Sequence, residues 1–349
     1  MKRRALVLDG RGRPALVATR SLGEAGYTVG VGAIEPRALA FSSRHASATH
    51  VLPDPRKDPG GFARTVADLP YDVILPMTDW SILPLMELRH LFGGRVAMAD
   101  NAAIQRTLNK ADTLALAAEA NVAVPTSAVV TTPGRSGLTL PIVVKTASSK
   151  GWTDGVAWDR APRYAFTEAE ERRHIAEFLE FGPVVCQEYV GGVGVGIGVL
   201  ADRGRALVKF QYRRLHEVPV SGGGSSYRVS EALSDDASGI ADRLAEALGW
   251  TGVMMVELKR TPDGALVLIE INGRFWGSLA LPYHAGVPFA AWLADLHTTG
   301  RTDFPDRYRV GVRVRTLRSD VEWVKECVRK SGRPEVSPYP GLSTVLRDT

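Results

Sequence analysis

The chain has 349 residues, more than one hydrophobic core usually organises, so two or three domains are expected. Hydrophobic residues make up 45% of the sequence and charged residues 23%, which excludes a disordered chain, a collagen-like repeat and a coiled coil. The net charge is +5, but no basic stripe interleaves with aromatic residues, so nucleic acid is not an expected partner.

Membrane association and secretion are not expected either. No apolar run approaches the roughly 18–20 residues that span a bilayer, and the apolar stretch near the start is too short for a secretory signal. The two cysteines, Cys186 and Cys327, form neither a metal-ligand spacing nor a disulfide framework. Together these features predict a cytoplasmic protein.

The first hundred residues alternate between apolar runs and stretches with helical spacing. A helix is predicted over 15–26, and strands are predicted over 5–9, 27–34, 72–79 and 95–100. Because strands separated by helices favour a parallel sheet, this part of the sequence predicts a doubly wound α/β unit.

From residue 101 onward the pattern changes to longer helices and β-rich segments. Helices are predicted over 102–122, 167–182, 235–250 and 320–330. Apolar runs predict strands over 141–147, 184–190, 195–202, 205–214 and 309–316. No internal repeat and no long linker separates these segments.

A hairpin is the clearest local signal. The apolar runs 253–260 and 265–272 are joined by Thr-Pro-Asp-Gly at 261–264, a sequence typical of turns. If this four-residue turn closes the hairpin, Arg260 faces Ala265, and Glu257 faces Leu268.

That register places two carboxylates and an amide together. Side chains on one strand share a face at every second residue, so Glu257, Glu270 and Asn272 would lie on one face, with Glu257 diagonal to Glu270. Oxygen ligands of this kind suit Mg²⁺. The alternative is an exposed sheet face that carries two solvated carboxylates.

Two further groups of residues suit anions. Lys145 ends a predicted strand and precedes the small loop at 148–151, where an ammonium and backbone N–H groups suit phosphate oxygens; the alternative is an ordinary loop. Arg213, Arg214 and Arg274 can bind carboxylate or phosphoryl groups. Because Arg213 and Arg214 are adjacent on a predicted strand, one of them is expected to face water.

A glycine-rich turn follows the first predicted strand. Gly10, Gly12 and Ala15 match the dinucleotide-binding pattern G-x-G-x-x-G/A, with Glu35 after the second strand as a possible ribose ligand. Any strand–helix–strand unit needs such a turn, so a structural turn and a site for part of the substrate remain alternatives.

The order of these features resembles the ATP-grasp superfamily over nearly all of residues 1–300. The pattern E-x-N-x-R at Glu270, Asn272 and Arg274 is its most diagnostic piece. The carbamoyl-phosphate-synthase-like and carboxylate–amine ligase branch is resembled in three segments, FSSRHASATHVLPDP (41–55), ILPMTDW (74–80) and YRRLHEVPVSGGGSS (212–226).

The resemblance implies an α/β (α+β) protein with the ATP-grasp fold. Its implied parts are an N-terminal Rossmann-like pre-ATP-grasp domain (1–100), a small ATP-binding subdomain (101–185), a large subdomain with the metal site (186–300) and a C-terminal strand–helix extension (301–349).

The resemblance also implies roles for individual residues. Those implied to contact ATP, through phosphates, the covering loop or adenine, are Lys110, Lys145, Ser148, Ser149, Gly151, Glu188 and Val190. One or two Mg²⁺ ions, with Mn²⁺ as a substitute, are implied to bind Glu257, Glu270 and Asn272. Arg274 and Arg213 are implied to face the transferring phosphoryl group and the substrate carboxylate.

One departure from the family pattern concerns the ribose of ATP. Members usually carry an acidic residue after the hinge, whereas this chain reads GGVGVGIG at 191–198. Nucleotide contacts are then looser, or an acid from elsewhere substitutes.

The implied reaction joins a small-molecule carboxylate to an amine, such as an amino acid or a natural-product precursor, in a monomer or homodimer. The carboxylate attacks the γ-phosphate of ATP, and the amine displaces phosphate from the acylphosphate to form an amide. His216 is a candidate base toward the amine, with an incidental loop histidine as the alternative. The rival functions are another ATP-grasp reaction (carboxylation or phosphorylation), an ATP-sensing module without turnover, and a Rossmann oxidoreductase.

Overall fold

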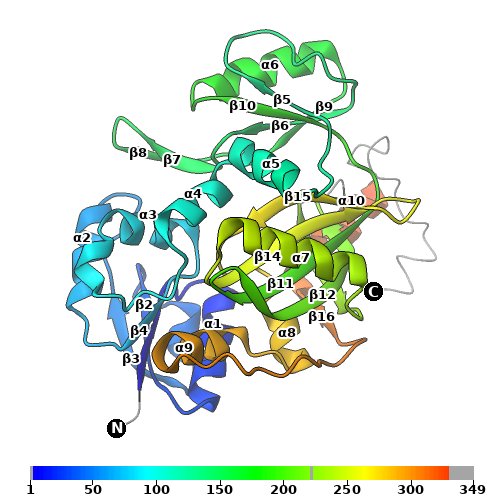
Figure 1. Ribbon diagram of the computed structural model, residues 1–349. Coiled ribbons are helices and arrows are strands. Elements are labelled where there is room, and N and C mark those ends of the chain that lie inside the picture. The colour runs from blue at the N-terminus through cyan, green and yellow to red at the C-terminus, as the bar shows by residue number, and fades with distance from the viewer. Residues whose placement is uncertain (1–2, 221–222, 330–349) are drawn as a thin grey trace.

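The computed structural model describes residues 3–220 and 223–329, which form three larger β-sheets and a small two-stranded one, with helices packed against them (Figure 1). Residues 221–222 of the predicted Gly/Ser loop and 330–349 of the predicted C-terminal extension lie outside the described residues. None of the described helices is long and apolar enough to cross a membrane.

The N-terminal part forms the predicted parallel sheet. Its strand order is β3 (Ala46–Val51), β2 (Thr28–Ala33), β1 (Arg4–Val7) and β4 (Val73–Leu75). Its helices are α1 (Arg13–Glu24), α2 (Pro59–Asp68) and α3 (Asp79–Glu87), with the short 3-10 helices η1 (Leu39–Ser42) and η2 (Arg89–Phe92). The strand predicted over 95–100 is only a single bridge between Ile74 and Val96, and β3 was not predicted because most of its side chains are not buried.

The long helix predicted over 102–122 is two helices, α4 (Asn101–Leu108) and α5 (Lys110–Glu119). Asn109 separates them because its backbone is extended and forms a bridge with Ser148. Its side chain caps α5 by accepting a hydrogen bond from the N–H of Ala111. This break places Lys110 at the first turn of α5, beside the loop after Lys145.

A second, antiparallel sheet lies at the top of Figure 1, with α6 (Glu168–Leu179) against it. Its strand order is β5 (Ser127–Val130), β10 (Val184–Glu188), β6 (Ile142–Thr146) and β9 (Arg163–Ala165). The hairpin β7 (Lys150–Thr153) and β8 (Val156–Asp159) projects from it toward the N-terminal part. The predicted domain boundary at 185/186 falls inside β10.

The largest sheet has six strands. Their order is β15 (Leu266–Asn272), β14 (Gly252–Arg260), β11 (Val193–Asp202), β12 (Arg205–Val218), β13 (Gly224–Ser230) and β16 (Arg313–Arg315). The helices packed around it include α7 (Asp235–Leu248), α8 (Ala280–Ala285), α9 (Phe289–Thr299) and α10 (Leu317–Arg329).

The glycine-rich run that breaks the family pattern lies in β11, at the centre of this sheet. A Cβ atom at Gly196 would lie 2.2 Å from the Tyr212 ring, and one at Gly198 would lie 2.5 Å from the Trp276 ring. Val195 and Ile197, which alternate with these glycines, are fully buried in the core shared with α7. Packing therefore requires the alternation: on one face of β11 the glycines leave room for large rings, and on the other face the branched residues fill the core.

The turn of the β14–β15 hairpin differs from the predicted one. Thr261, and not Arg260, lies opposite Ala265, and its N–H donates to the Ala265 carbonyl oxygen at 2.9 Å. A three-residue loop closes the hairpin, with Gly264 in the left-handed region at φ 93°.

A register shift further along the same hairpin moves the two glutamates together. Glu257 pairs directly with Glu270, and Leu258 pairs with Leu268, because the ladder is irregular between Glu257 and Leu258. The predicted pairing of Glu257 with Leu268 is therefore wrong, and Leu268 is buried in the core.

Candidate functional site

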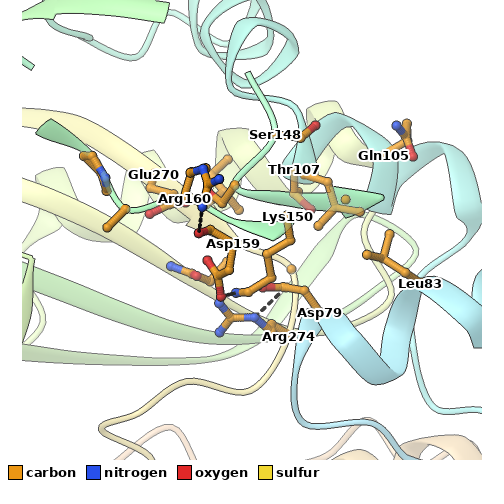
Figure 2. Close-up of a pocket in the computed structure, with 18 of the residues that line it drawn as sticks. Asp79, Leu83, Gln105, Thr107, Ser148, Lys150, Asp159, Arg160, Glu270 and Arg274 are labelled. Atoms are coloured by element: carbon orange, nitrogen blue, oxygen red, sulfur yellow. Dashed lines mark hydrogen bonds and ion pairs between the residues drawn. The ribbon is translucent and has the colours of Figure 1, made fainter. Parts of the chain in front are cut away.

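Two adjoining cavities lie beside the β14–β15 hairpin, one between it and the second sheet and the other between it and α3, α4 and the β7–β8 hairpin. The first, here called the lysine cavity, is about 290 Å³ and is lined by Lys110, Lys145 and Glu257 among others. The second, the arginine cavity, is about 420 Å³ and is lined by Lys150 and Arg274 among others (Figure 2). Ser149, Pro162 and Glu270 line both, so the two cavities form one continuous site.

Lys145 is buried near the end of β6, with 8% of its surface exposed. Its Nζ atom donates to Oε1 of Gln187 in β10 at 2.6 Å, a neutral partner. Burial lowers the pKa of Lys145 to about 8, although the charge of Glu270 opposes the shift. No carboxylate among the described residues forms an ion pair with this buried ammonium, which is therefore suited to an anionic ligand.

Lys110 approaches the same cavity from α5. Its Nζ atom donates to the Ser149 hydroxyl at 2.5 Å and lies 3.9 Å from Oε1 of Glu270. The backbone N–H of Lys110 donates to the carbonyl of Ala147, which ties the loop at 148–149 to the start of α5. The structure therefore brings both predicted lysines and the predicted loop together.

Gly151 serves the packing of the β7–β8 hairpin as well as lining the arginine cavity. A Cβ atom at this position would lie 2.8 Å from the Trp158 ring across the hairpin. Any larger residue would push the two strands apart.

The three predicted metal ligands lie on one face of the β14–β15 hairpin. Glu257 and Glu270 are direct cross-strand partners, and Asn272 is two residues beyond Glu270 on the same strand. Burial raises the pKa of Glu257 and the nearby charge of Glu270 raises it further, while Arg214 opposes both.

Arg214, and not Arg213, faces this site, which corrects the prediction from sequence. The Arg214 side chain is 6% exposed and its Nη2 atom lies 2.8 Å from Oε1 of Glu257. Arg213 lies on the opposite face of β12, where it is 40% exposed and pairs with Glu231. Alternation along a strand requires one of the two to face the site, but the residues alone do not say which one.

The hinge residues also line the lysine cavity. Glu188 and Val190 are both among its lining residues, together with Tyr189. The N–H of Glu188 donates to the Thr126 carbonyl at 2.9 Å, and its side chain accepts a hydrogen bond from the N–H of Thr139. These two groups of Glu188 therefore stabilise the local fold.

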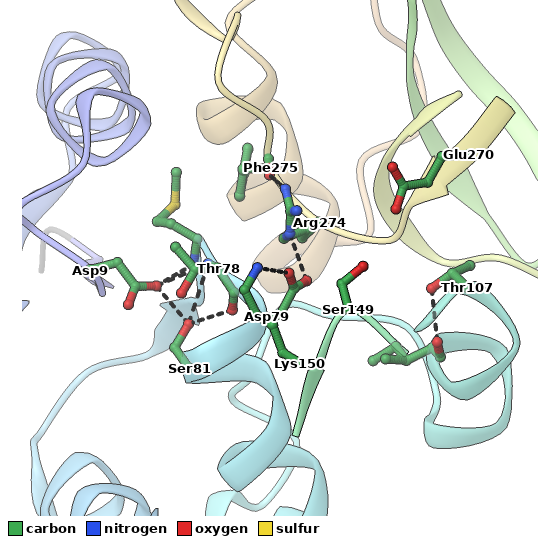
Figure 3. Close-up of polar contacts among 12 residues, drawn as sticks. Asp9, Thr78, Asp79, Ser81, Thr107, Ser149, Lys150, Glu270, Arg274 and Phe275 are labelled. Atoms are coloured by element: carbon green, nitrogen blue, oxygen red, sulfur yellow. Dashed lines mark hydrogen bonds and ion pairs between the residues drawn. The ribbon is translucent and has the colours of Figure 1, made fainter. Parts of the chain in front are cut away.

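Three residues far apart in the sequence meet in the arginine cavity, as Figures 2 and 3 show. Asp79, the first residue of α3, accepts a hydrogen bond from Nε of Arg274 at 2.6 Å and one from Nζ of Lys150 at 3.0 Å. Burial alone would raise the pKa of Asp79, but the charges of Arg274 and Lys150 outweigh it and lower the pKa to about 2.

Sequence reasoning did not single out Asp79 or Lys150 as functional residues. Both lie in segments that carried the family resemblance, Asp79 in ILPMTDW and Lys150 in the loop at 148–151. That location was the available signal, since only the fold reveals their pairing with Arg274.

His216 lines neither cavity, which favours the alternative of an incidental histidine over a base toward the amine. The ring is 1% exposed, and Nδ1 lies 2.7 Å from Oδ1 of Asp320 in α10. It also stacks on Trp323 with ring centroids 3.5 Å apart. These contacts anchor α10 against β12.

Comparisons with known proteins agree with this architecture. A family model described as "ATP-grasp in the biosynthetic pathway with Ter operon" matches residues 180–319. No curated protein sequence matches the chain significantly.

Solved structures share the fold over most of the chain. An L-amino acid ligase from Bacillus licheniformis is 14% identical with a TM-score of 0.67, covering 86% of this chain and 74% of its own. The N5-carboxyaminoimidazole synthetase from Staphylococcus aureus is 16% identical with a TM-score of 0.68, covering 89% and 81%. A biotin carboxylase from Campylobacter jejuni is 15% identical with a TM-score of 0.67, covering 88% and 74%. The chain therefore has the ATP-grasp fold, as its sequence resemblance predicted.

Proposed function

We propose that the chain is an ATP-dependent carboxylate–amine ligase that forms an amide through an acylphosphate and releases ADP and phosphate. The observation that carries this proposal is the continuity of the two cavities. One presents two lysines opposite two glutamates, and the other presents Arg274 and Lys150. The L-amino acid ligase among the similar structures supports the same reaction class.

In this proposal the lysine cavity binds ATP. Lys110 and Lys145 donate charge-assisted hydrogen bonds to phosphate oxygens. Such bonds are stronger in a partly buried site than in water. Ser148, Ser149 and Gly151 lie over the phosphates. The hinge at Glu188 and Val190 borders adenine.

The donor set on the β14–β15 hairpin fits Mg²⁺. Mg²⁺ prefers oxygen ligands and is commonly held by one or two carboxylates plus substrate phosphates, so Glu257, Glu270 and the Asn272 amide oxygen suffice. When bound, the ion would neutralise negative charge on the ATP phosphates. Arg214 positions Glu257 for that role through their 2.8 Å ion pair.

Family members usually contact the ribose of ATP through an acidic residue after the hinge, which this chain lacks. In this proposal the pair of Lys259 in β14 and Glu217 in β12 makes that contact. Nζ of Lys259 lies 2.8 Å from Oε2 of Glu217, and Lys259 lines the lysine cavity. A Cβ atom at Gly194 would lie 2.3 Å from Oε1 of Glu217, so the glycine run makes room for this side chain.

The arginine cavity binds the substrate carboxylate next to the γ-phosphate. Arg274 is held by Asp79 through its Nε atom, which fixes the guanidinium plane. Lys150 adds a second cation on the same carboxylate of Asp79. Catalysis then consists of positioning the attacking carboxylate and neutralising charge, which is how phosphoryl transfer is generally catalysed.

Carboxylation is the second candidate, because a biotin carboxylase and an N5-carboxyaminoimidazole synthetase are among the similar structures. In that case bicarbonate would take the place of the organic carboxylate. Phosphorylation of a hydroxyl and ATP sensing without turnover are the remaining alternatives.

One experiment separates these functions. The protein is incubated with ATP and Mg²⁺ and a panel of amino acids, singly and in pairs, with and without bicarbonate, and ADP and phosphate are measured. We expect equal amounts of ADP and phosphate that depend on a carboxylate and an amine. Bicarbonate dependence would support carboxylation, ADP without phosphate a kinase, and no turnover with any pair a sensor.

A further inference from the structure

A third cavity, here called the N-terminal cavity, lies apart from the two already described. It is about 370 Å³ and shares no described lining residue with either of them. It lies at the carboxyl ends of the parallel strands, since Asp9 follows β1, Glu35 follows β2, Asp54 follows β3 and Thr78 follows β4. In open α/β sheets ligands bind at this edge, where the strand order reverses.

The polar wall of this cavity contains a carboxylate with one unused oxygen. Oε1 of Glu35 lies 3.2 Å from Arg11, whereas Oε2 is buried and accepts no hydrogen bond from any described residue. Buried polar atoms are almost always satisfied, and Glu35 lines the cavity, so the unpartnered oxygen points to a ligand that donates to this carboxylate once the side chain turns toward it. The Arg11 side chain is 77% exposed, so its pairing with Glu35 contributes little and can be displaced.

Part of the lining is apolar. Leu52 and Phe62 are buried members of the core beneath the cavity, and Ile34 and Trp80 also line it. Such a lining suits a ligand with a planar ring at one end and polar groups at the other. The ring is removed from water, and the polar groups reach Glu35.

We propose that the N-terminal cavity binds the ribonucleoside part of a small molecule, with the two ribose hydroxyls donating to Glu35 and the base against Leu52 and Phe62. Glu35 lies two residues after the end of β2, in a parallel unit whose first turn contains Gly10-Arg11-Gly12. From this position a carboxylate reaches ribose hydroxyls in this topology. The cavity volume is at the lower end of the roughly 300–1,000 Å³ typical of small-molecule sites.

A complete dinucleotide does not fit this turn. The N–H groups of Gly10 and Gly12 already donate to the carbonyls of Gly32 and Asp9 at 2.9 Å. Pro14, in the first turn of α1, has no N–H to offer a pyrophosphate. The structure therefore favours a nucleoside over NAD.

The site borders the proposed ligase site without depending on it. Thr78 and Trp80 line the N-terminal cavity, while Asp79 between them lines the arginine cavity. Figure 3 shows Asp9 bonded to Thr78 and Ser81 on one side and Asp79 bonded to Arg274 on the other. A nucleoside bound here would lie beside Asp79.

Binding calorimetry on the full chain tests the proposal. Adenosine, guanosine, cytidine and uridine are titrated into protein saturated with Mg²⁺ and the non-hydrolysable analogue adenylyl imidodiphosphate, so that the proposed ATP site is filled. We expect saturable binding of at least one ribonucleoside with a stoichiometry of one. The matching 2′,3′-dideoxynucleoside should bind at least about tenfold more weakly, because the carboxylate then loses its donors.

Two variants locate the site. Glu35→Gln should weaken nucleoside binding at least about tenfold, and it should fold normally because Glu35 is partly exposed. Glu87→Gln, an exposed carboxylate in the same part of the chain, is the matched control and should bind like the wild type.

The proposal is overturned if no ribonucleoside binds, if Glu35→Gln binds as tightly as the wild type, or if the dideoxynucleoside is not discriminated. It is also overturned if aromatic amines such as tryptamine bind in a Glu35-dependent way and ribonucleosides do not. Because the readout is binding outside the ATP site, none of these results bears on the ligase activity itself.

Discussion

Among individual residues, Arg214 is the one whose role the structure assigns most directly. It pairs with both Glu257, at 2.8 Å, and Glu217, at 3.4 Å, so it stands between the proposed metal ligands and the proposed ribose contact. Arg213, its neighbour on β12, points away from the site. The same substitution at Arg213 and at Arg214 therefore gives two matched variants, because both positions lie on β12 and both variants have the same net charge.

We predict that Arg214→Lys lowers kcat/KM at least about tenfold, because lysine cannot bridge two carboxylates with a planar fork. Arg213→Lys should stay within about twofold of the wild type. Steady-state kinetics with varied MgATP measures both, and thermal melting checks that both variants fold. A larger loss in Arg213→Lys than in Arg214→Lys would show that the site faces the other side of β12.

The pKa of Lys145 predicts a pH dependence of ATP binding. Since burial lowers this pKa from 10.5 to about 8, the ammonium loses its proton as the pH rises through about 8, and affinity for MgATP should fall. Lys145→Arg keeps its charge well above that pH, so its affinity should not show the decline. Calorimetry between about pH 7 and pH 9.5 measures the difference, and the same decline in both proteins would rule out Lys145 as its cause.

The same pKa has a consequence for stability. The unfolded chain holds the proton more tightly than the folded one, so burying the ammonium costs free energy at low pH. This cost is relieved as the pH rises from about 8 to 10.5, and the contribution of Lys145 to the free energy of unfolding increases over that window. Lys145→Met should lack this contribution in ligand-free melting experiments.

At the scale of elements, the break between α4 and α5 links local sequence to the site. Asn109 caps α5 and pairs with Ser148, and the cap places Lys110 beside Ser149. Thr167 caps α6 in the same way, by accepting a hydrogen bond from the N–H of Glu170, but α6 is remote from both cavities.

We predict that Asn109→Ala and Thr167→Ala each lower stability by about 0.5–2 kcal/mol through loss of an N-cap. Only Asn109→Ala should also weaken ATP binding, several-fold, because it releases Lys110. Chemical denaturation and calorimetry measure the two quantities separately. Equal ATP affinity in the two variants would mean that the cap does not position Lys110.

Elements also show how far the sequence could predict this structure. The parallel N-terminal sheet and the β14–β15 hairpin could be predicted, because periodicity and turn residues are local signals. The register of the hairpin could not, since it depends on a bulge and a left-handed Gly264 that determine which residues pair. For the same reason, strand pattern alone could not decide between Arg213 and Arg214.

Across the whole molecule, the site depends on contacts between distant parts of the chain. Asp79, Lys150 and Arg274 come from the N-terminal part, the β7–β8 hairpin and the segment after β15, respectively. No spacing in the sequence reveals such a meeting point. The resemblance to a family identified Arg274 but not the partner that orients it.

The effect of MgATP on thermal stability tests the proposed metal site. We predict that MgATP raises the Tm of the wild type, as any ligand of the native state does, and that Glu270→Gln loses most of this shift together with activity. Without ligand, Glu270→Gln should melt close to the wild type, because removing one of two adjacent carboxylates relieves their repulsion. Glu119→Gln, an exposed carboxylate at the end of α5, is the control. An unchanged MgATP shift in Glu270→Gln would contradict the metal assignment.

In the proposed reaction a substrate carboxylate attacks the γ-phosphate of ATP, and the rest of the mechanism depends on this step. It is tested most directly with the amino acid that supports turnover, labelled with ¹⁸O in its carboxylate, by mass spectrometry of the phosphate released. An acylphosphate route transfers one carboxylate oxygen to phosphate in each turnover, so we expect phosphate that contains one ¹⁸O atom. Phosphate without ¹⁸O, released in step with ADP, would contradict carboxylate activation and with it the proposed ligase mechanism.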